Sequence, residues 1–133
     1  MSERPDPLRV ARQWAEKADH DLTTAQHTLQ LEQNCPYDTI CFHGQQCVEK
    51  YLKALLSYHK IDFPKTHDVT ELLALIPINS RLGLKPEELA ELNPYAVDGR
   101  YPGEAESEDR ADADSAIKLA IKVRSAVRKA MEL

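Results

Sequence analysis

Residues 37–60 read YDTICFHGQQCVEKYLKALLSYHK, and this segment decides the fold because its apolar residues recur at helical spacing. At about 100° per residue, one broad face of the helix carries only apolar or small residues. These residues are Ile40, Gly44, Cys47, Val48, Tyr51, Leu52 and Leu55. A face of this width indicates a helix that packs on a core, so the segment predicts an α-helical domain.

A polar stripe borders this apolar face. Its members are His43, Gln46, Lys50, Lys53 and Ser57, which fall within about 80° of arc. Phe42 and Leu56 lie farther round the helix, beside Gln45 and Glu49, and form a smaller apolar spot. Because exposed apolar spots mark contacts with other proteins, we predict that Phe42 and Leu56 lie at a subunit contact.

The composition indicates one helical domain over residues 1–133. Hydrophobic residues make up 42% of the chain and charged residues 29%, as in soluble globular proteins. Only four glycines are present, and stretches rich in Ala, Leu, Glu and Lys favour helices over strands. A net charge of −5 argues against binding to nucleic acid through overall charge, although it leaves a local basic patch open.

The cysteines and the hydropathy predict a cytoplasmic protein. Cys35, Cys41 and Cys47 are odd in number and no signal peptide precedes them, which suits reduced thiols. No apolar run reaches the roughly 20 residues that a membrane span needs. We therefore expect a soluble chain without a membrane segment.

Five helical segments are predicted from apolar spacing, caps and prolines. They run from about Pro7 to Leu31, from Tyr37 to Lys60, from Thr66 or His67 up to Pro77, from Pro86 up to Asn93, and from Ser107 to Met131. Residues 98–108 lack periodicity and are predicted to form a loop. Short connections between long helices predict an all-α, up-and-down bundle of four to five antiparallel helices.

The polar stripe is the candidate binding site. Lys50 and Lys53, one turn apart, offer donors to an anion such as a phosphate, and His43 and Gln46 continue the line. His67, at a helix start, and Arg100, in the long loop, could complete the site. The alternative is that the stripe is simply the solvated flank of the helix.

Other groups of residues give weaker indications of a functional site. Asp21 either has a polar role or forms an ion pair, with Lys17 or with a neighbouring helix. His43 and Cys47 could share a metal, but no second ligand pair completes a site, and no nucleophile with a paired base is apparent. The basic end of the last helix could contact RNA, although the helix dipole accounts for it without a partner. We thus assign no cofactor, no metal ligand and no catalytic residue.

Four motifs together resemble the HEPN family of small prokaryotic helical proteins. They are ADHDLTTAQ at residues 18–26, CFHGQQCVEKYLKALL at 41–56, THDVTELLALI at 66–76 and DGRYP at 98–102. Their order and spacing agree from about Trp14 to the last helix. The resemblance implies a helical bundle that pairs as a homodimer.

The resemblance also implies a function. Many such proteins act with a minimal nucleotidyltransferase in a two-component, often toxin and antitoxin, system, and a nucleotide-binding role has been proposed for them. The matching positions give the expected ligand-binding residues His43, Gln46, Lys50, Lys53, His67, Arg100 and Tyr101, supported by Asp21 and Glu49.

One departure from the family concerns catalysis. Ribonuclease members carry an R-x4-6-H motif near the start of the last helix, and this chain has no histidine after His67. Arg100 and Arg110 therefore lack the imidazole that general acid–base chemistry needs. A divergent, metal-independent ribonuclease that uses Arg100 with His67 or His43, and a dimeric scaffold that binds no ligand, remain the alternatives.

Overall fold

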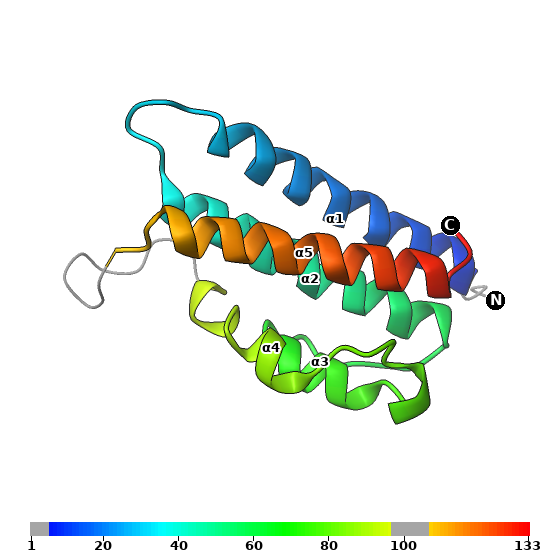
Figure 1. The fold of residues 1–133 in the computed structure, drawn as a ribbon. Coiled ribbons are helices and arrows are strands. Elements are labelled where there is room, and N and C mark those ends of the chain that lie inside the picture. The colour runs from blue at the N-terminus through cyan, green and yellow to red at the C-terminus, as the bar shows by residue number, and fades with distance from the viewer. Residues whose placement is uncertain (1–5, 97–106) are drawn as a thin grey trace.

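The computed structural model describes residues 6–96 and 107–133, and every regular element within these ranges is helical (Figure 1). The elements are α1 (Pro7–Leu29), α2 (Tyr37–Tyr58), α3 (Val69–Leu75), the 3-10 turn η1 (Ile78–Ser80), α4 (Pro86–Ala90), the 3-10 turn η2 (Asn93–Tyr95) and α5 (Arg110–Ala130). The predicted all-helical class is confirmed. None of the helices in these ranges combines the length and apolar character that crossing a membrane requires.

Side-chain caps set the helix starts. Asp6 accepts a hydrogen bond from the backbone N–H of Leu8 before α1. Before α5, the side chain of Asp109 accepts from the N–H of Asp112, and that of Asp112 accepts from the N–H of Asp109. This reciprocal capping box starts the last helix at Arg110, three residues after the predicted start at Ser107.

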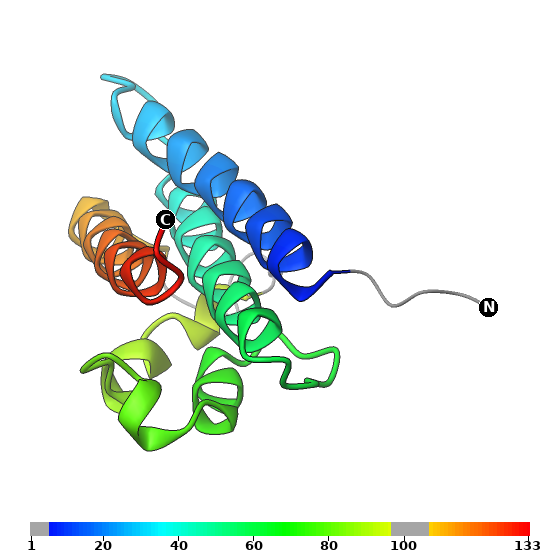
Figure 2. The ribbon, with the colours of Figure 1, turned by 90° about the vertical axis from the view of Figure 1, so that its right-hand side faces the viewer.

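Helix α2 lies at the centre of the molecule, between α1, α5 and the α3–α4 segment (Figure 2). Helix α1 runs antiparallel to it, because His43 near the start of α2 contacts Asp21 late in α1, whereas Lys53 contacts Trp14. The central position explains why α2 is buried on almost every side.

Helix α5 runs in the same direction as α2. Gly44 faces Ala116, and Tyr51, farther along α2, shares Asp19 with Arg124, farther along α5. The short helices of residues 69–95 carry the chain back along the bundle before α5 begins (Figure 1). The up-and-down order is thus preserved, with a segmented third arm that places α5 parallel to α2.

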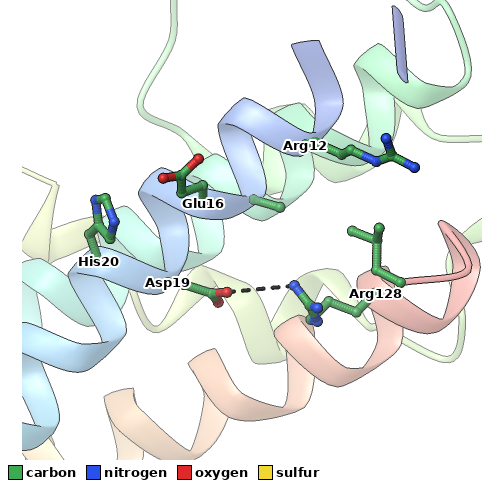
Figure 3. Close-up of a pocket in the computed structure, with 7 residues that line it drawn as sticks. Arg12, Glu16, Asp19, His20 and Arg128 are labelled. Atoms are coloured by element: carbon green, nitrogen blue, oxygen red, sulfur yellow. Dashed lines mark ion pairs between the residues drawn. The ribbon is translucent and has the colours of Figure 1, made fainter. Parts of the chain in front are cut away.

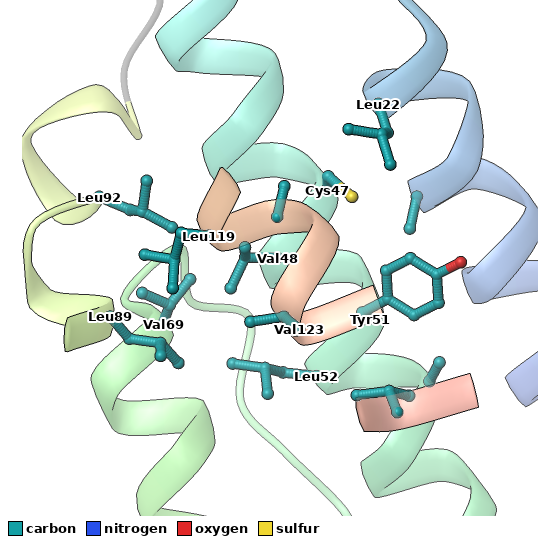
Figure 4. Packing of buried hydrophobic residues seen from close by; sticks show 14 of the residues in the cluster. Leu22, Cys47, Val48, Tyr51, Leu52, Val69, Leu89, Leu92, Leu119 and Val123 are labelled. Carbon is teal, nitrogen blue, oxygen red and sulfur yellow. The ribbon is translucent and has the colours of Figure 1, made fainter. Parts of the chain in front are cut away.

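The core gathers side chains from all of these helices around α2 (Figure 4). Tyr51, Val48 and Leu52 of α2 are fully buried, as the broad apolar face predicted. All three cysteines are free thiols, and Cys41 and Cys47 are buried.

The structure corrects the role predicted for Leu56. Leu56 is fully buried within the chain and so does not lie at a subunit contact, whereas Phe42 is half-buried. The chain after α2 folds back over this side of the helix, since the neighbouring side chain of Gln45 donates to the carbonyl oxygen of His67. The sequence pattern of α2 alone could not show that the following segment covers its back.

Candidate functional site

The first polar cluster joins α1 to α2 and consists of Asp21, His43 and Lys50, here called the Asp21 cluster. Nδ1 of His43 lies 2.8 Å from Oδ1 of Asp21, and Nζ of Lys50 lies 2.5 Å from Oδ2. Asp21 is only 8% exposed, so its charge is compensated mainly by these two partners. Of the predicted alternatives for Asp21, the ion pair with a neighbouring helix is the one that the structure contains.

The Asp21 carboxylate fixes the orientation of the imidazole of His43. A hydrogen bond to an ionised carboxylate requires a proton on Nδ1, so in the neutral ring the lone pair lies on Nε2. A quarter of the His43 side chain is exposed, and its ring packs edge to face against that of Phe42, with the ring centroids 5.4 Å apart. His43 is therefore a partly exposed hydrogen-bonding group of defined orientation.

The second polar cluster, the Glu49 cluster, consists of Glu49, Lys53, His67, Gln45 and Gln46. Nδ1 of His67 lies 2.9 Å from Oε1 of Glu49, and Nζ of Lys53 lies 3.1 Å from Oε2. Gln46 donates to Oε1 of Gln45, and Gln45 donates in turn to Oε1 of Glu49. The cluster thus ties α2 to the start of α3 through a buried carboxylate.

Lys53 is more enclosed than a ligand-binding lysine was expected to be. Only 8% of the residue is exposed, and its ammonium group lies 5.4 Å from the ring centroid of Trp14 and 5.9 Å from that of Phe63. The two rings themselves meet edge to face, 6.4 Å apart. Cation–π attraction and the ion pair with Glu49 hold the ammonium group in place, so Lys53 has a structural role among the residues of the polar stripe.

The predicted site residues therefore fall into two carboxylate-centred clusters along α2. His43 and Lys50 meet at Asp21, whereas Lys53, His67 and Gln46 meet at or beside Glu49. Arg100 and Tyr101, the other predicted ligand residues, lie outside the described residues.

The charges of the clusters are balanced by pairing. Each lysine faces one carboxylate, so the positive charge that the sequence offered to an anion is largely offset. The exposed groups that remain are His67, with 68% of its side chain accessible, and the partly exposed His43 and Lys50. The surface can accordingly donate or accept hydrogen bonds through imidazoles, with Lys50 as the accessible cation.

A third polar cluster, centred on Asp19, was not predicted from the sequence. Asp19 accepts hydrogen bonds from the hydroxyl of Tyr51 and from Nε of Arg124 at 2.8 Å, and Nη1 of Arg128 lies 3.5 Å away. Burial, followed by the hydrogen bond to Asp19, raises the pKa of Tyr51, and the bond to Asp19 raises the pKa of Arg124. The spacing of Arg124 and Arg128, one turn apart, was the available signal for a shared acid.

A pocket of about 270 Å³ opens beside this third cluster, between α1 and α5 (Figure 3). Its walls include Arg12, Ala15, Glu16, Asp19 and His20 from α1, Arg128 from α5, and Leu133. Within the described residues, no group of three or more His, Cys, Asp or Glu side chains is arranged to hold a metal ion.

Comparisons with known proteins agree with the helical architecture. The family model described as the HEPN domain matches residues 11–130. A crystal structure of TT1696 from Thermus thermophilus is similar at 29% identity with a TM-score of 0.76, covering 90% of this chain and 97% of that one. A crystal structure of ST0689, an archaeal HEPN homologue, is similar at 25% identity with a TM-score of 0.68, covering 91% and 97% of the two chains. No curated protein matches.

Proposed function

We propose, from the premise that this chain belongs to the HEPN family, that it is a non-catalytic binding module for a nucleotide or another phosphate-bearing ligand. The ligand would lie along the polar face of α2, at His43, Gln46, Lys50 and His67, with Lys53 beneath it. Arg100 and Tyr101 complete the proposed set as an added cation and a ring for base stacking.

The orientation of the two imidazoles is the observation that carries this proposal. Asp21 and Glu49 each hold a histidine through Nδ1, at 2.8 Å and 2.9 Å, and so direct Nε2 away from the carboxylate. Such supporting bonds lower the entropy cost of recognising a ligand, because the rings are already oriented. Lys50 adds the accessible positive charge.

The wider role follows from the family. We propose that two copies of the chain pair as a homodimer in the cytoplasm and act with a minimal nucleotidyltransferase in a two-component system of the toxin and antitoxin type. A half-buried Phe42 beside His43 supports a contact near the proposed ligand site. Light scattering on the purified chain, and its co-purification with a nucleotidyltransferase encoded beside it, would test these two contacts.

Trp14 provides a direct test of ligand binding because it is the only tryptophan in the chain and lies 5.4 Å from the ammonium group of Lys53. Titration with ATP, GTP and their monophosphates should give a saturable change in Trp14 fluorescence. His43→Gln and Lys50→Gln should each weaken the interaction about tenfold, the loss of one charge-assisted contact. His27→Gln, an exposed histidine on α1, serves as the control. The absence of saturation with any nucleotide would remove the proposal.

A divergent ribonuclease is the second candidate, and the same two carboxylate–histidine pairs favour it. An imidazole with its Nδ1–H bound to a carboxylate can take up a proton at Nε2, as a general base must. Incubation with structured and unstructured RNA without added metal would test it. Cleavage that is lost in His43→Gln, His67→Gln or Arg100→Ala, but not in His27→Gln, would establish the enzyme and displace the binding module.

A further inference from the structure

We infer that the pocket between α1 and α5 is a binding site for a compact phosphate-bearing anion such as pyrophosphate. This pocket involves none of the residues of the Asp21 and Glu49 clusters, so the inference does not depend on the proposed function. It rests on the two arginines that line the pocket, on the positioning of Arg128 by Asp19, and on the size of the space.

Two arginines and two acids line this pocket. Arg12 and Arg128 come from opposite helices, and the lining carboxylates are those of Asp19 and Glu16. The charge of Asp19 is already offset by Arg124, which does not line the pocket, so the two lining arginines are not fully compensated by the lining acids. Within the described part of the chain Arg12 forms no ion pair, although Glu16 lies one turn away from it on the same helix.

Asp19 is committed to Arg124 more than to Arg128. Oδ1 of Asp19 accepts from Tyr51 and from Nε of Arg124 at 2.8 Å, whereas Nη1 of Arg128 lies 3.5 Å from Oδ2. A guanidinium has five N–H donors, so the contacts of Arg128 with Asp19 and Tyr51 leave other donors available to a ligand. The buried Tyr51 anchors the carboxylate, which in turn positions Arg128 at the wall (Figure 3).

The chemistry and the size of the pocket indicate a small oxyanion. Planar guanidinium groups bind phosphate oxygens through paired N–H donors, better than a point charge does. A volume of about 270 Å³ lies just below the usual range for drug-sized ligands, which suits pyrophosphate or the terminal phosphates of a larger molecule. The buried methyl group of Ala15 forms an apolar part of the lining.

Calorimetric titration of the full chain with sodium pyrophosphate, in a buffer of low ionic strength without phosphate, tests the inference. The wild-type chain should bind saturably, and Arg12→Gln should bind at least about tenfold more weakly. Because Arg12 forms no ion pair within the described residues, Arg12→Gln should fold and melt like the wild type. Arg128→Lys keeps the positive charge but removes the paired N–H donors of the guanidinium, so it should also weaken the binding of pyrophosphate.

Arg9→Gln is the matched control, since Arg9 is an exposed arginine on the same helix that does not line the pocket. It should bind pyrophosphate within about twofold of the wild type. Three results would overturn the inference: no saturation in the wild type, unchanged binding by Arg12→Gln, or an equal loss in Arg9→Gln, which would mean unspecific attraction to surface charge. Pyrophosphate binding that is weakened by His43→Gln but unchanged in Arg12→Gln would place the anion on the polar face of α2 instead.

Discussion

Nδ1 of His43 lies 2.8 Å from Oδ1 of Asp21, so a carboxylate of α1 orients the first histidine of the polar stripe on α2. The same carboxylate binds Lys50 through its other oxygen. One acid thus links two helices, compensates a cation and sets the tautomer of a ring.

Asp21→Asn should lower the free energy of unfolding by about 1–3 kcal/mol, because it leaves Lys50 without its counter-charge in a mostly buried position. Urea denaturation measures the change. Asp114→Asn is the control, since its ion pair with Arg110 spans 4.0 Å on the exposed surface and should contribute less than about 0.5 kcal/mol. Equal effects of the two substitutions would contradict a structural role for Asp21.

Gly44→Val should destabilise the chain by about 1–3 kcal/mol through overpacking. A Cβ at position 44 would lie 3.0 Å from Cβ of Ala116 and 3.3 Å from its carbonyl carbon, so α2 and α5 would have to separate. The double variant with Ala116→Gly should recover part of the loss, because it removes the nearest atom but not the backbone. Thermal unfolding of the two variants provides the measurement, and a lack of coupling between the sites would contradict the close approach.

Cys41 and Cys47 should not react with a thiol reagent at pH 8 while the chain is folded. Burial, assisted by Glu108 and Asp112, raises the pKa of Cys41 to about 12, and burial raises the pKa of Cys47 as well, so almost no thiolate is present. Any rapid reaction should belong to the half-buried Cys35 and should disappear in Cys35→Ser. Rapid modification of all three thiols under native conditions would show that α2 opens readily.

Stability should fall as the pH rises above about 9. The pKa of Cys41 is 9.0 when unperturbed and about 12 in the fold, so the unfolded chain loses a proton that the folded chain retains. The contribution of the Cys41 thiol to the free energy of unfolding is complete below pH 9 and is lost progressively up to pH 12. The hydroxyl of Tyr51, whose pKa is also raised, adds a similar loss from about pH 10. Urea midpoints at pH 7, 9 and 10.5 measure the trend. Tyr51→Phe should reduce the change of the urea midpoint with pH. An unchanged pH dependence would argue against the buried hydroxyl as one of its causes.

Asp68→Ala should cost about 1 kcal/mol, whereas Asp68→Asn should cost much less, because asparagine also caps helices. Asp68 accepts from the backbone N–H groups of Thr70 at 2.9 Å and Glu71 at 3.2 Å, and from Nδ2 of Asn93 at 2.9 Å. The hydroxyl of Thr70 is the main cause of the lowered pKa of this carboxyl.

The pH dependence gives a second measurement for Asp68. With its folded pKa below the unperturbed 3.8, the contribution is present above pH 3.8 and is lost as the pH falls through the folded value. The advantage of the wild type over Asp68→Asn in free energy of unfolding should therefore be constant above about pH 4 and shrink below it. A loss at pH 7 in Asp68→Asn that equals that of Asp68→Ala would point to an altered helix start instead.

The long helices were predictable because their signals are local. Apolar spacing and prolines located α1 and α2 to within two residues at each end, and the acids before and after Arg110 form the capping box of α5. The short elements were predicted only roughly, since α3 and α4 depend on packing against their neighbours more than on their own length.

The site was predictable as a set of residues but not as an arrangement. The stripe on α2 gave His43, Lys50 and Lys53, yet nothing in the spacing showed that each lysine would face a carboxylate. Burial of Lys53 depends on Phe63, which follows α2 in an irregular segment, and such long-range contacts leave no periodic signal. The role of Asp19 depended likewise on where α5 lies.

The central position of α2 has a consequence for how the protein is made. During synthesis α1 and α2 leave the ribosome before α5, and they can form a hairpin of neighbouring segments early. The surface of α2 that receives Ala116, Ala120 and Val123 stays uncovered until α5 has emerged. The nascent hairpin would therefore expose an apolar surface. A nascent chain stalled on the ribosome before residue 110 should bind chaperones.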